Sequence, residues 1–163
     1  MRSRLALPLI CWLLTVSLLR PSLAQKPAAP TAAPVADDYW GMYSFLKDGE
    51  FVQITIEDKG VVSGFISRFG DSESDRGTFL NQFFKSGKID GTKLSFTTES
   101  VHGIWFTFEG SFERGPGKKP DEEAYYVLRG ALTRFTTDTE KEVTSQITQV
   151  AFKSFPRDAT PSP

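Results

Sequence analysis

The chain has 163 residues but only one cysteine, Cys11, and one histidine, His102. Cys11 lies in an apolar N-terminal segment that we predict is removed, so the remaining chain has no disulfide and no thiol nucleophile. A single histidine excludes a three-histidine zinc site within one chain. A serine–histidine–acid triad would have to use His102, and the sequence has no Gly-x-Ser-x-Gly elbow to present the serine.

The chain also has no excess of basic charge. It contains 19 Lys and Arg residues and 20 Asp and Glu residues. Three of the basic residues and none of the acidic ones lie in the first 24 positions, so the remainder has 16 basic against 20 acidic residues, a net charge of −4. Binding to nucleic acid or to anionic membranes requires clustered Lys and Arg, and the composition therefore argues against both functions.

The first 24 residues have the pattern of a secretory signal peptide. A short basic segment, Met1–Arg4, precedes an almost wholly apolar stretch from Leu5 to Leu19, and small residues at Ser22 and Ala24 suit cleavage after Ala24. We therefore predict a secreted or periplasmic protein. The apolar stretch is shorter than the roughly 20 residues that span a bilayer, and a retained membrane anchor is the alternative.

The composition divides the rest of the chain into three segments. Residues 25–37 are rich in proline and alanine and predict a disordered linker. Residues 38–156 form one segment of a size that can bury its own apolar core, and we predict a single domain there. Residues 157–163 contain Pro161 and Pro163 and predict a disordered tail.

The domain is all-β in its pattern, because short runs of Val, Ile, Thr, Phe and Tyr alternate with turn residues. No stretch has the pattern of a long amphipathic helix. Glycine at positions 49, 60 and 91 marks tight hairpin turns, which favours an up-and-down antiparallel meander. The eight predicted strands are Trp40–Leu46, Glu50–Glu57, Val61–Phe69, Thr78–Lys85, Thr92–Thr98, His102–Glu113, Glu123–Phe135 and Glu142–Phe155.

Three glycines inside these strands indicate how the sheet curves. Gly64, Gly110 and Gly130 each lie two positions from apolar residues and so share their face of the strand. Glycine within a strand weakens packing and suits a sharp bend. We therefore favour closure into an eight-stranded barrel, whose interior takes side chains or one small ligand. A β-sandwich is the alternative.

Alternation along the strands divides the aromatic residues into an inward and an outward set. The inward set is Phe96, Phe106, Phe108, Phe112 and Tyr126, and His102 alternates with Phe106 and Phe108 on the same face. The candidates for lining a ligand pocket are Trp40, Tyr43, His102, Phe106, Phe108 and Tyr126. The outward residues are candidates for contact with a partner or a second subunit, because exposed aromatic patches mark such contacts; they are Phe51, Trp105 and Tyr125.

The acidic segment Asp71-x-Glu73-x-Asp75 has the spacing of calcium ligands but not the calcium loop of an EF-hand. That loop needs glycine at its sixth position and glutamate at its twelfth, and here those positions hold Arg76 and Gln82. We predict a solvated loop, no metal site and no cofactor.

The meander opens with Trp40-Gly41-x-Tyr43 and later contains the aromatic strand Gly103-Ile104-Trp105-Phe106-Thr107-Phe108. This pattern resembles the calycin group, the lipocalins and avidins. The lipocalin opening usually has Gly before Trp, whereas here Trp comes first. The resemblance implies an up-and-down barrel with a ligand in its lumen, and it assigns no individual binding residue.

Three functions are consistent with this sequence. The first is an exported module that binds a small apolar or amphipathic molecule in the barrel lumen. The second is a ligand-free structural or interaction protein of the cell envelope or extracellular space. The third, an isomerase or cyclase, would need His102 or a buried carboxylate with a shifted pKa.

Overall fold

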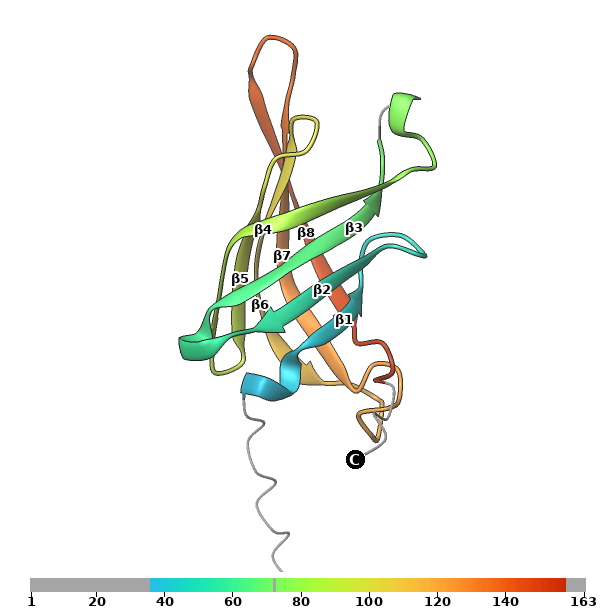
Figure 1. The fold of residues 1–163 in the computed structure, drawn as a ribbon, viewed down its shortest axis with the longest axis vertical. Helices are drawn as coiled ribbons and strands as arrows, with labels where there is room; N and C mark the ends of the chain where they lie inside the picture. Colours follow the sequence, from blue (N-terminus) through green and yellow to red (C-terminus); the bar gives the residue numbers. More distant parts are fainter. Residues whose placement is uncertain (1–35, 72, 158–163) are drawn as a thin grey trace, which may run out of the picture. The chain divides into compact units, whose positions relative to one another are not determined.

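A computed structural model of the chain describes residues 36–71 and 73–157. The predicted signal peptide, Cys11, most of the linker and most of the tail lie outside these residues. Eight antiparallel strands form one sheet in the order of the sequence (Figure 1). Their bounds are β1 Gly41–Ser44, β2 Phe51–Ile56, β3 Val62–Phe69, β4 Phe79–Asp90, β5 Lys93–Thr98, β6 Ile104–Arg114, β7 Tyr126–Thr137 and β8 Val143–Lys153.

Three short 3-10 helices accompany the strands. Helix η1 (Ala36–Tyr39) precedes β1, η2 (Asp58–Gly60) links β2 to β3, and η3 (Glu73–Asp75) lies between β3 and β4. In the part of the chain that the structure describes, no helix is long and apolar enough to cross a membrane.

The sheet curls until its last strand reaches its first. Tyr43 of β1 forms an isolated antiparallel bridge with Ser154, directly after β8. The Phe155 N–H donates to the Met42 carbonyl oxygen at 2.9 Å, and the Lys153 N–H donates to Ser44 Oγ at 2.9 Å. The predicted all-β, up-and-down barrel is therefore confirmed, and the two stacked sheets of a sandwich do not form.

Glycine allows the backbones of neighbouring strands to approach closely where the sheet bends. Gly110 of β6 and Gly130 of β7 are opposite each other in register. A Cβ atom at Gly110 would collide with the carbonyl oxygen of Arg129, and one at Gly130 with that of Glu109. Gly64 has a φ of +153°, which L-residues rarely adopt. All three glycines lie on the inward side of the barrel, as their sequence positions predict.

The strand boundaries differ from the prediction mainly at β4. This strand continues to Asp90 instead of ending near Lys85. Its pairing with β5 shifts between Phe84 and Ser86, as a β-bulge does. The bulge breaks the alternation of apolar and polar residues, so the second half of β4 does not have the pattern of a strand in the sequence.

The barrel interior is a packed aromatic and aliphatic core. Tyr39 of η1 stacks on Phe112 with ring centroids 4.3 Å apart, and Tyr43 lies 5.6 Å from the same ring. Further rings follow along the axis, where Phe108 contacts both Phe96 and Phe152. Burying these rings contributes most of the apolar stabilisation of the domain, and helix η1 closes one end of the barrel.

Candidate functional site at the barrel mouth

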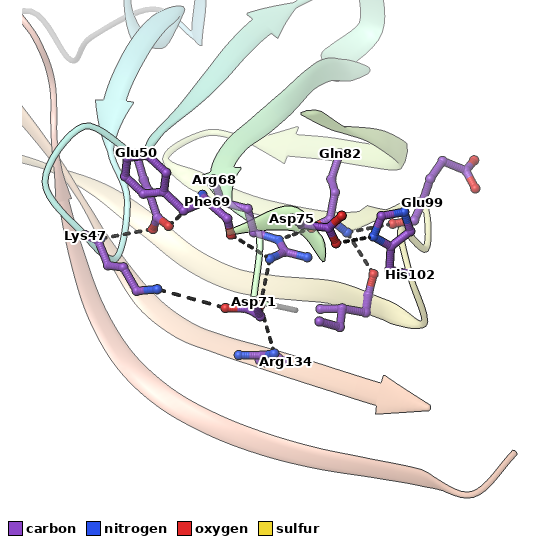
Figure 2. Close-up of polar contacts among 11 residues, drawn as sticks. Lys47, Glu50, Arg68, Phe69, Asp71, Asp75, Gln82, Glu99, His102 and Arg134 are labelled. Carbon is purple, nitrogen blue, oxygen red and sulfur yellow. Dashed lines mark hydrogen bonds and ion pairs between the residues drawn. The ribbon is translucent and has the colours of Figure 1, made fainter. Parts of the chain in front are cut away.

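The connections β1–β2, β3–β4, β5–β6 and β7–β8 lie at one end of the barrel, because the strands alternate in direction. We call this end the mouth. It carries charged side chains that point toward one another from the β1–β2 loop, β3, the β3–β4 loop and β7 (Figure 2). The opposite end, covered by η1, is aromatic.

Arg68 is a deeply buried positive charge at the mouth. It lies on β3 two residues after Ile66, on the inward side, and its side chain is only 4% exposed. Its Nε donates to Oε1 of the buried Gln82, whose Nε2 donates to the Ile104 carbonyl oxygen at 2.8 Å. Burial lowers the pKa of Arg68, and the nearby Asp71 carboxylate opposes this shift. Gln82 thus fixes the guanidinium in a desolvated position.

Asp71 receives two guanidinium groups at once. Its Oδ2 accepts hydrogen bonds from Arg68 Nη1 at 2.7 Å and from Arg134 Nη2 at 3.0 Å. Lys47 Nζ lies 4.0 Å from Asp71 Oδ1. Arg134 Nε is buried and has no hydrogen-bond partner among the described residues. Two arginines therefore converge on one carboxylate, and the buried Nε–H of Arg134 has no acceptor among the described residues.

Glu50 is the second carboxylate at the mouth, and its hydrogen bonds go to backbone N–H groups and not to the arginines. It is buried, and its two oxygens accept hydrogen bonds from the backbone N–H groups of Phe69, at 3.0 Å, and Lys47, at 3.1 Å. Its role is to hold the β1–β2 loop against the end of β3 (Figure 2). Three cations at the mouth face two carboxylates, which leaves an excess of one positive charge.

A cavity of about 50 Å³ lies between these groups. Arg68 and Phe106 lie at its inner side, and the guanidinium carbon of Arg68 is 5.7 Å from the centre of the Phe106 ring. The other lining residues are Phe45, Leu46, Lys47, Glu50, Phe69, Asp71 and Arg134. The cavity is lined by aromatic rings and by the cationic side chains of Lys47, Arg68 and Arg134, but it has room for only one or two water molecules.

The structure places four of the predicted pocket residues inside the barrel. Tyr43, Phe106, Phe108 and Tyr126 are all buried in the core. They pack against other side chains, and Phe106 alone of the four also lines the mouth cavity. Tyr43 donates a hydrogen bond to the Tyr39 carbonyl oxygen at 2.8 Å, and burial raises the pKa of Tyr43 far above its ordinary value.

The inward position predicted for His102 is wrong, and Trp40, which was predicted to line the pocket, is exposed as well. His102 lies in the β5–β6 turn with a positive φ of 52°, its side chain is 58% exposed, and its Nδ1 is 2.6 Å from Asp75 Oδ2. Trp40 precedes β1 and is 52% exposed, with the Arg157 guanidinium over its ring. Both residues lie in the predicted strands but outside the observed ones, because β1 begins at Gly41 and β6 at Ile104.

The outward aromatic residues pack on neighbours across the sheet instead of standing alone. Trp105 stacks on Phe135 with centroids 5.0 Å apart, and Phe51 lies 5.8 Å from Phe65. Tyr125 lies under the Arg114 guanidinium, 3.3 Å from the ring centre. Each is half-buried in the described chain.

Sequence reasoning missed the two arginines at the mouth, although the sequence contained a signal for them. Arg68 continues the inward alternation of Val62, Gly64 and Ile66, and Arg134 follows Leu132 on the inward side of β7. A charged residue at an inward strand position indicates either a paired core charge or a binding site. In the acidic loop, Asp71 pairs with two arginines and Asp75 with His102. The described residues contain no cluster suited to a metal ion.

Comparison with known proteins shows similarity in fold and not in sequence. No protein family profile matches the chain, and no curated protein is significantly similar in sequence. Among solved structures, rhizavidin has a TM-score of 0.55 at 12% identity, over 75% of this chain and 86% of rhizavidin. Intact apo afifavidin has a TM-score of 0.53 at 12% identity, over 76% of this chain and 85% of its own. A rhizavidin–biotin complex has a TM-score of 0.52 at 12% identity, over 70% of this chain and 97% of the rhizavidin chain. The chain therefore has a calycin-type, avidin-like fold.

Proposed function

We propose that this chain is an exported binding module that takes a small amphipathic carboxylate at the mouth of its barrel. The observation that carries the proposal is the convergence of Arg68 and Arg134 on the single carboxylate of Asp71, above the ring of Phe106. Guanidinium groups recognise carboxylates through paired N–H donors, and such bonds are stronger in a partly desolvated site.

The Asp71 carboxylate lies where the carboxylate of a ligand would bind. A ligand oxygen at this place would accept from both arginines, and its second oxygen would accept from Arg134 Nε. An unsatisfied buried donor costs about 1–3 kcal/mol, so satisfying it would favour the ligand over Asp71. The apolar part of the ligand would lie against Leu46 and Phe69 at the rim.

We place the ligand at the mouth and not deep in the lumen, because buried aromatic side chains fill the lumen. A molecule bound deeper would have to displace Phe106 or Phe108 and lose several kcal/mol of packing. The avidin-like fold supports this general function, since rhizavidin is known in complex with biotin. Biotin has a carboxylate on an apolar body, so it belongs in the test.

The test is a calorimetric titration with straight-chain carboxylates of increasing length and with biotin. Matched primary amides and alcohols serve as uncharged probes. We expect binding of at least one carboxylate, no binding of its amide, and at least a tenfold loss of affinity in Arg134→Gln, about 1.4 kcal/mol. Arg129→Gln is the control, because Arg129 is exposed and pairs with Glu113 away from the mouth.

Two results would contradict the proposal. One is the absence of heat and of any rise in melting temperature with every carboxylate. The other is equal binding of a carboxylate and its amide, which would remove any role for the paired arginines.

A second candidate function, an interaction protein, rests on the outer face of β2, β3 and β4. Phe51, Phe65 and Phe83 form a row of touching rings across these strands, and Phe83 is 60% exposed. Exposed aromatic rows are typical of contact surfaces.

This second proposal includes contact with a partner or a second subunit through Phe51, Trp105 and Tyr125. Phe83→Ser should abolish binding to a partner captured from the host and leave the melting temperature within a few degrees; Val61→Ser, exposed outside the row, is the control.

Export to the periplasm or the extracellular space is part of the first proposal and rests on the first 24 residues. Intact mass and N-terminal sequencing of the protein from its host should give a chain that begins at Gln25. A mature protein that retains Met1 would contradict export by cleavage and favour the membrane anchor.

A further inference from the structure

Strand β8 is paired fully on one side and almost unpaired on the other. Its residues Val143–Lys153 pair with β7 along their whole length. On the other side β1 has only four residues and reaches β8 through the bridge between Tyr43 and Ser154. The β7–β8 hairpin projects beyond β1 and β2 (Figure 1). In the described chain, the segment 143–151 has no strand partner on that side.

The hydrogen bonds at the two ends of β8 show which backbone groups face this free edge. The Ser154 N–H donates to Tyr126 on β7, whereas the N–H groups of Lys153 and Phe155 donate toward β1. At the other end, the Asp138 N–H donates to the Glu142 carbonyl oxygen. Antiparallel pairs alternate between bonded and non-bonded positions. The N–H and C=O groups of the odd-numbered residues from 143 to 151 therefore point to the free edge.

This edge carries none of the features that prevent strands from pairing with other chains. Natural edge strands carry lysine, proline or a bulge, or are very short. The segment Val-Thr-Ser-Gln-Ile-Thr-Gln-Val-Ala at 143–151 has no charged residue and no proline, and its register with β7 is unbroken. Its residues also favour strands, with β-branched side chains at five of nine positions.

We propose that this edge pairs with the same edge of a second copy of the chain, in antiparallel orientation. An uncharged segment can pair with itself without repulsion. The charges at its ends also fit this orientation. The hairpin tip has a net negative charge, because it contains Asp138, Glu140 and Glu142 but only one basic residue, Lys141. The other end of the segment is basic because of Lys153. Antiparallel pairing directs the acidic tip of one copy toward the basic end of the other, whereas parallel pairing would bring the acidic tips together.

The side chains on the outer surface of the hairpin support the same contact. Val143 and Ile147 are exposed, Ile147 by 68%. They lie beside Phe135, because their register partners on β7 are Thr137 and Thr133. Pairing around Ser145 and Ile147 would bring these apolar side chains next to those of the second copy and bury them. The proline-rich segment 25–34 of the same chain suits this edge less, because proline has no N–H to donate.

Hydrogen exchange of the intact mature chain tests the proposal residue by residue. At high concentration we expect slow exchange at the amides of Ser145, Ile147 and Gln149. On dilution these amides should become fast, while the neighbouring amides of Gln146 and Thr148, which face β7, stay slow. Sedimentation should show a monomer–dimer equilibrium over the same concentration range.

Ser145→Pro removes one donor at the free edge and keeps the bonds to β7, so it should raise the dimer dissociation constant at least tenfold. Ser145→Ala, which keeps the N–H, should leave that constant within about twofold. Ile147→Lys places a positive charge on each of the two paired β8 strands, and the repulsion should give a monomer. This variant tests the proposed dimer even if Ser145→Pro does not fold. A monomer at every soluble concentration overturns the proposal, as does a dimer that survives both Ser145→Pro and Ile147→Lys.

Discussion

The two ends of the barrel are built from different chemistry. At the η1 end, Tyr39, Tyr43, Phe112 and Tyr126 pack together, and the Arg114 guanidinium lies against this cluster, 5.4 Å from the centre of the Tyr126 ring. At the mouth, guanidinium and carboxylate groups surround a small cavity. Packed rings stabilise a fold through buried area, whereas converging cations are costly to desolvate unless an anion satisfies them. The first end therefore holds the barrel together, and the second is the end at which we propose that a ligand binds.

The largest expected effect comes from breaking the η1 end. Phe112→Ala removes a ring that stacks on Tyr39 and touches Tyr43, and such a change costs about 3–5 kcal/mol of unfolding free energy. Trp40→Ala, at an exposed ring near the same end, should cost about 1 kcal/mol. Urea unfolding measures both. Equal losses would show that the η1 end is not a packed core.

High pH should also weaken the η1 end before the mouth. Burial raises the pKa values of Tyr43, Tyr39 and Tyr126. The unfolded chain loses these protons near pH 10 while the folded chain keeps them, so stability is complete below pH 10 and falls above it. Each tyrosine contributes a slope of up to about 1.4 kcal/mol per pH unit.

Unfolding free energies measured between about pH 8 and pH 12 should reveal this slope. Tyr43→Phe should reduce it, at the cost of the hydrogen bond to Tyr39, about 1 kcal/mol at neutral pH. A Tyr43→Phe variant whose stability declines as steeply as that of the unchanged protein would contradict the assignment of alkaline sensitivity to this end.

At the mouth, Asp71→Ala should lower the free energy of unfolding by about 1–2 kcal/mol, because Arg68 loses a charge-assisted hydrogen bond but stays hydrogen-bonded to Gln82. Added formate or acetate should restore part of this loss by binding between the arginines, and thermal unfolding in matched ionic strength measures the recovery. Glu113→Ala, which removes the exposed partner of Arg129, is the control, and added formate or acetate should not raise its melting temperature. No rescue of Asp71→Ala would mean that the two arginines do not bind a free carboxylate.

Local pattern was enough to predict the strands and the inward side chains that lie within them. Tyr43, Phe106, Phe108 and Tyr126 follow a strict alternation, and the structure buries all of them. Alternation fails at strand ends, where a turn residue with positive φ has no fixed side. His102 was misplaced for this reason, since β6 begins only at Ile104.

The mouth could not be predicted by the same means, because its parts are far apart in the chain. Asp71 and Arg134 are separated by 63 residues and meet only when the sheet curls. Their pairing depends on register, on curvature and on the length of the β3–β4 loop together. The alternation along β3 and β7 contains a signal for Arg68 and Arg134 as inward charges, which was missed, but no pattern within one strand could identify Asp71 as their common partner.

The smallest expected effect is at the rim of the mouth. His102→Ala removes an exposed contact with Asp75, and exposed ion pairs contribute about 0–1 kcal/mol. Because His102 points away from the cavity, carboxylate binding in the calorimetric titration should stay within about twofold of the unchanged protein. A large loss of affinity would move the binding site from the arginines to the β5–β6 turn. Equal affinity, together with its loss in Arg134→Gln, would confine recognition to the guanidinium groups inside the barrel.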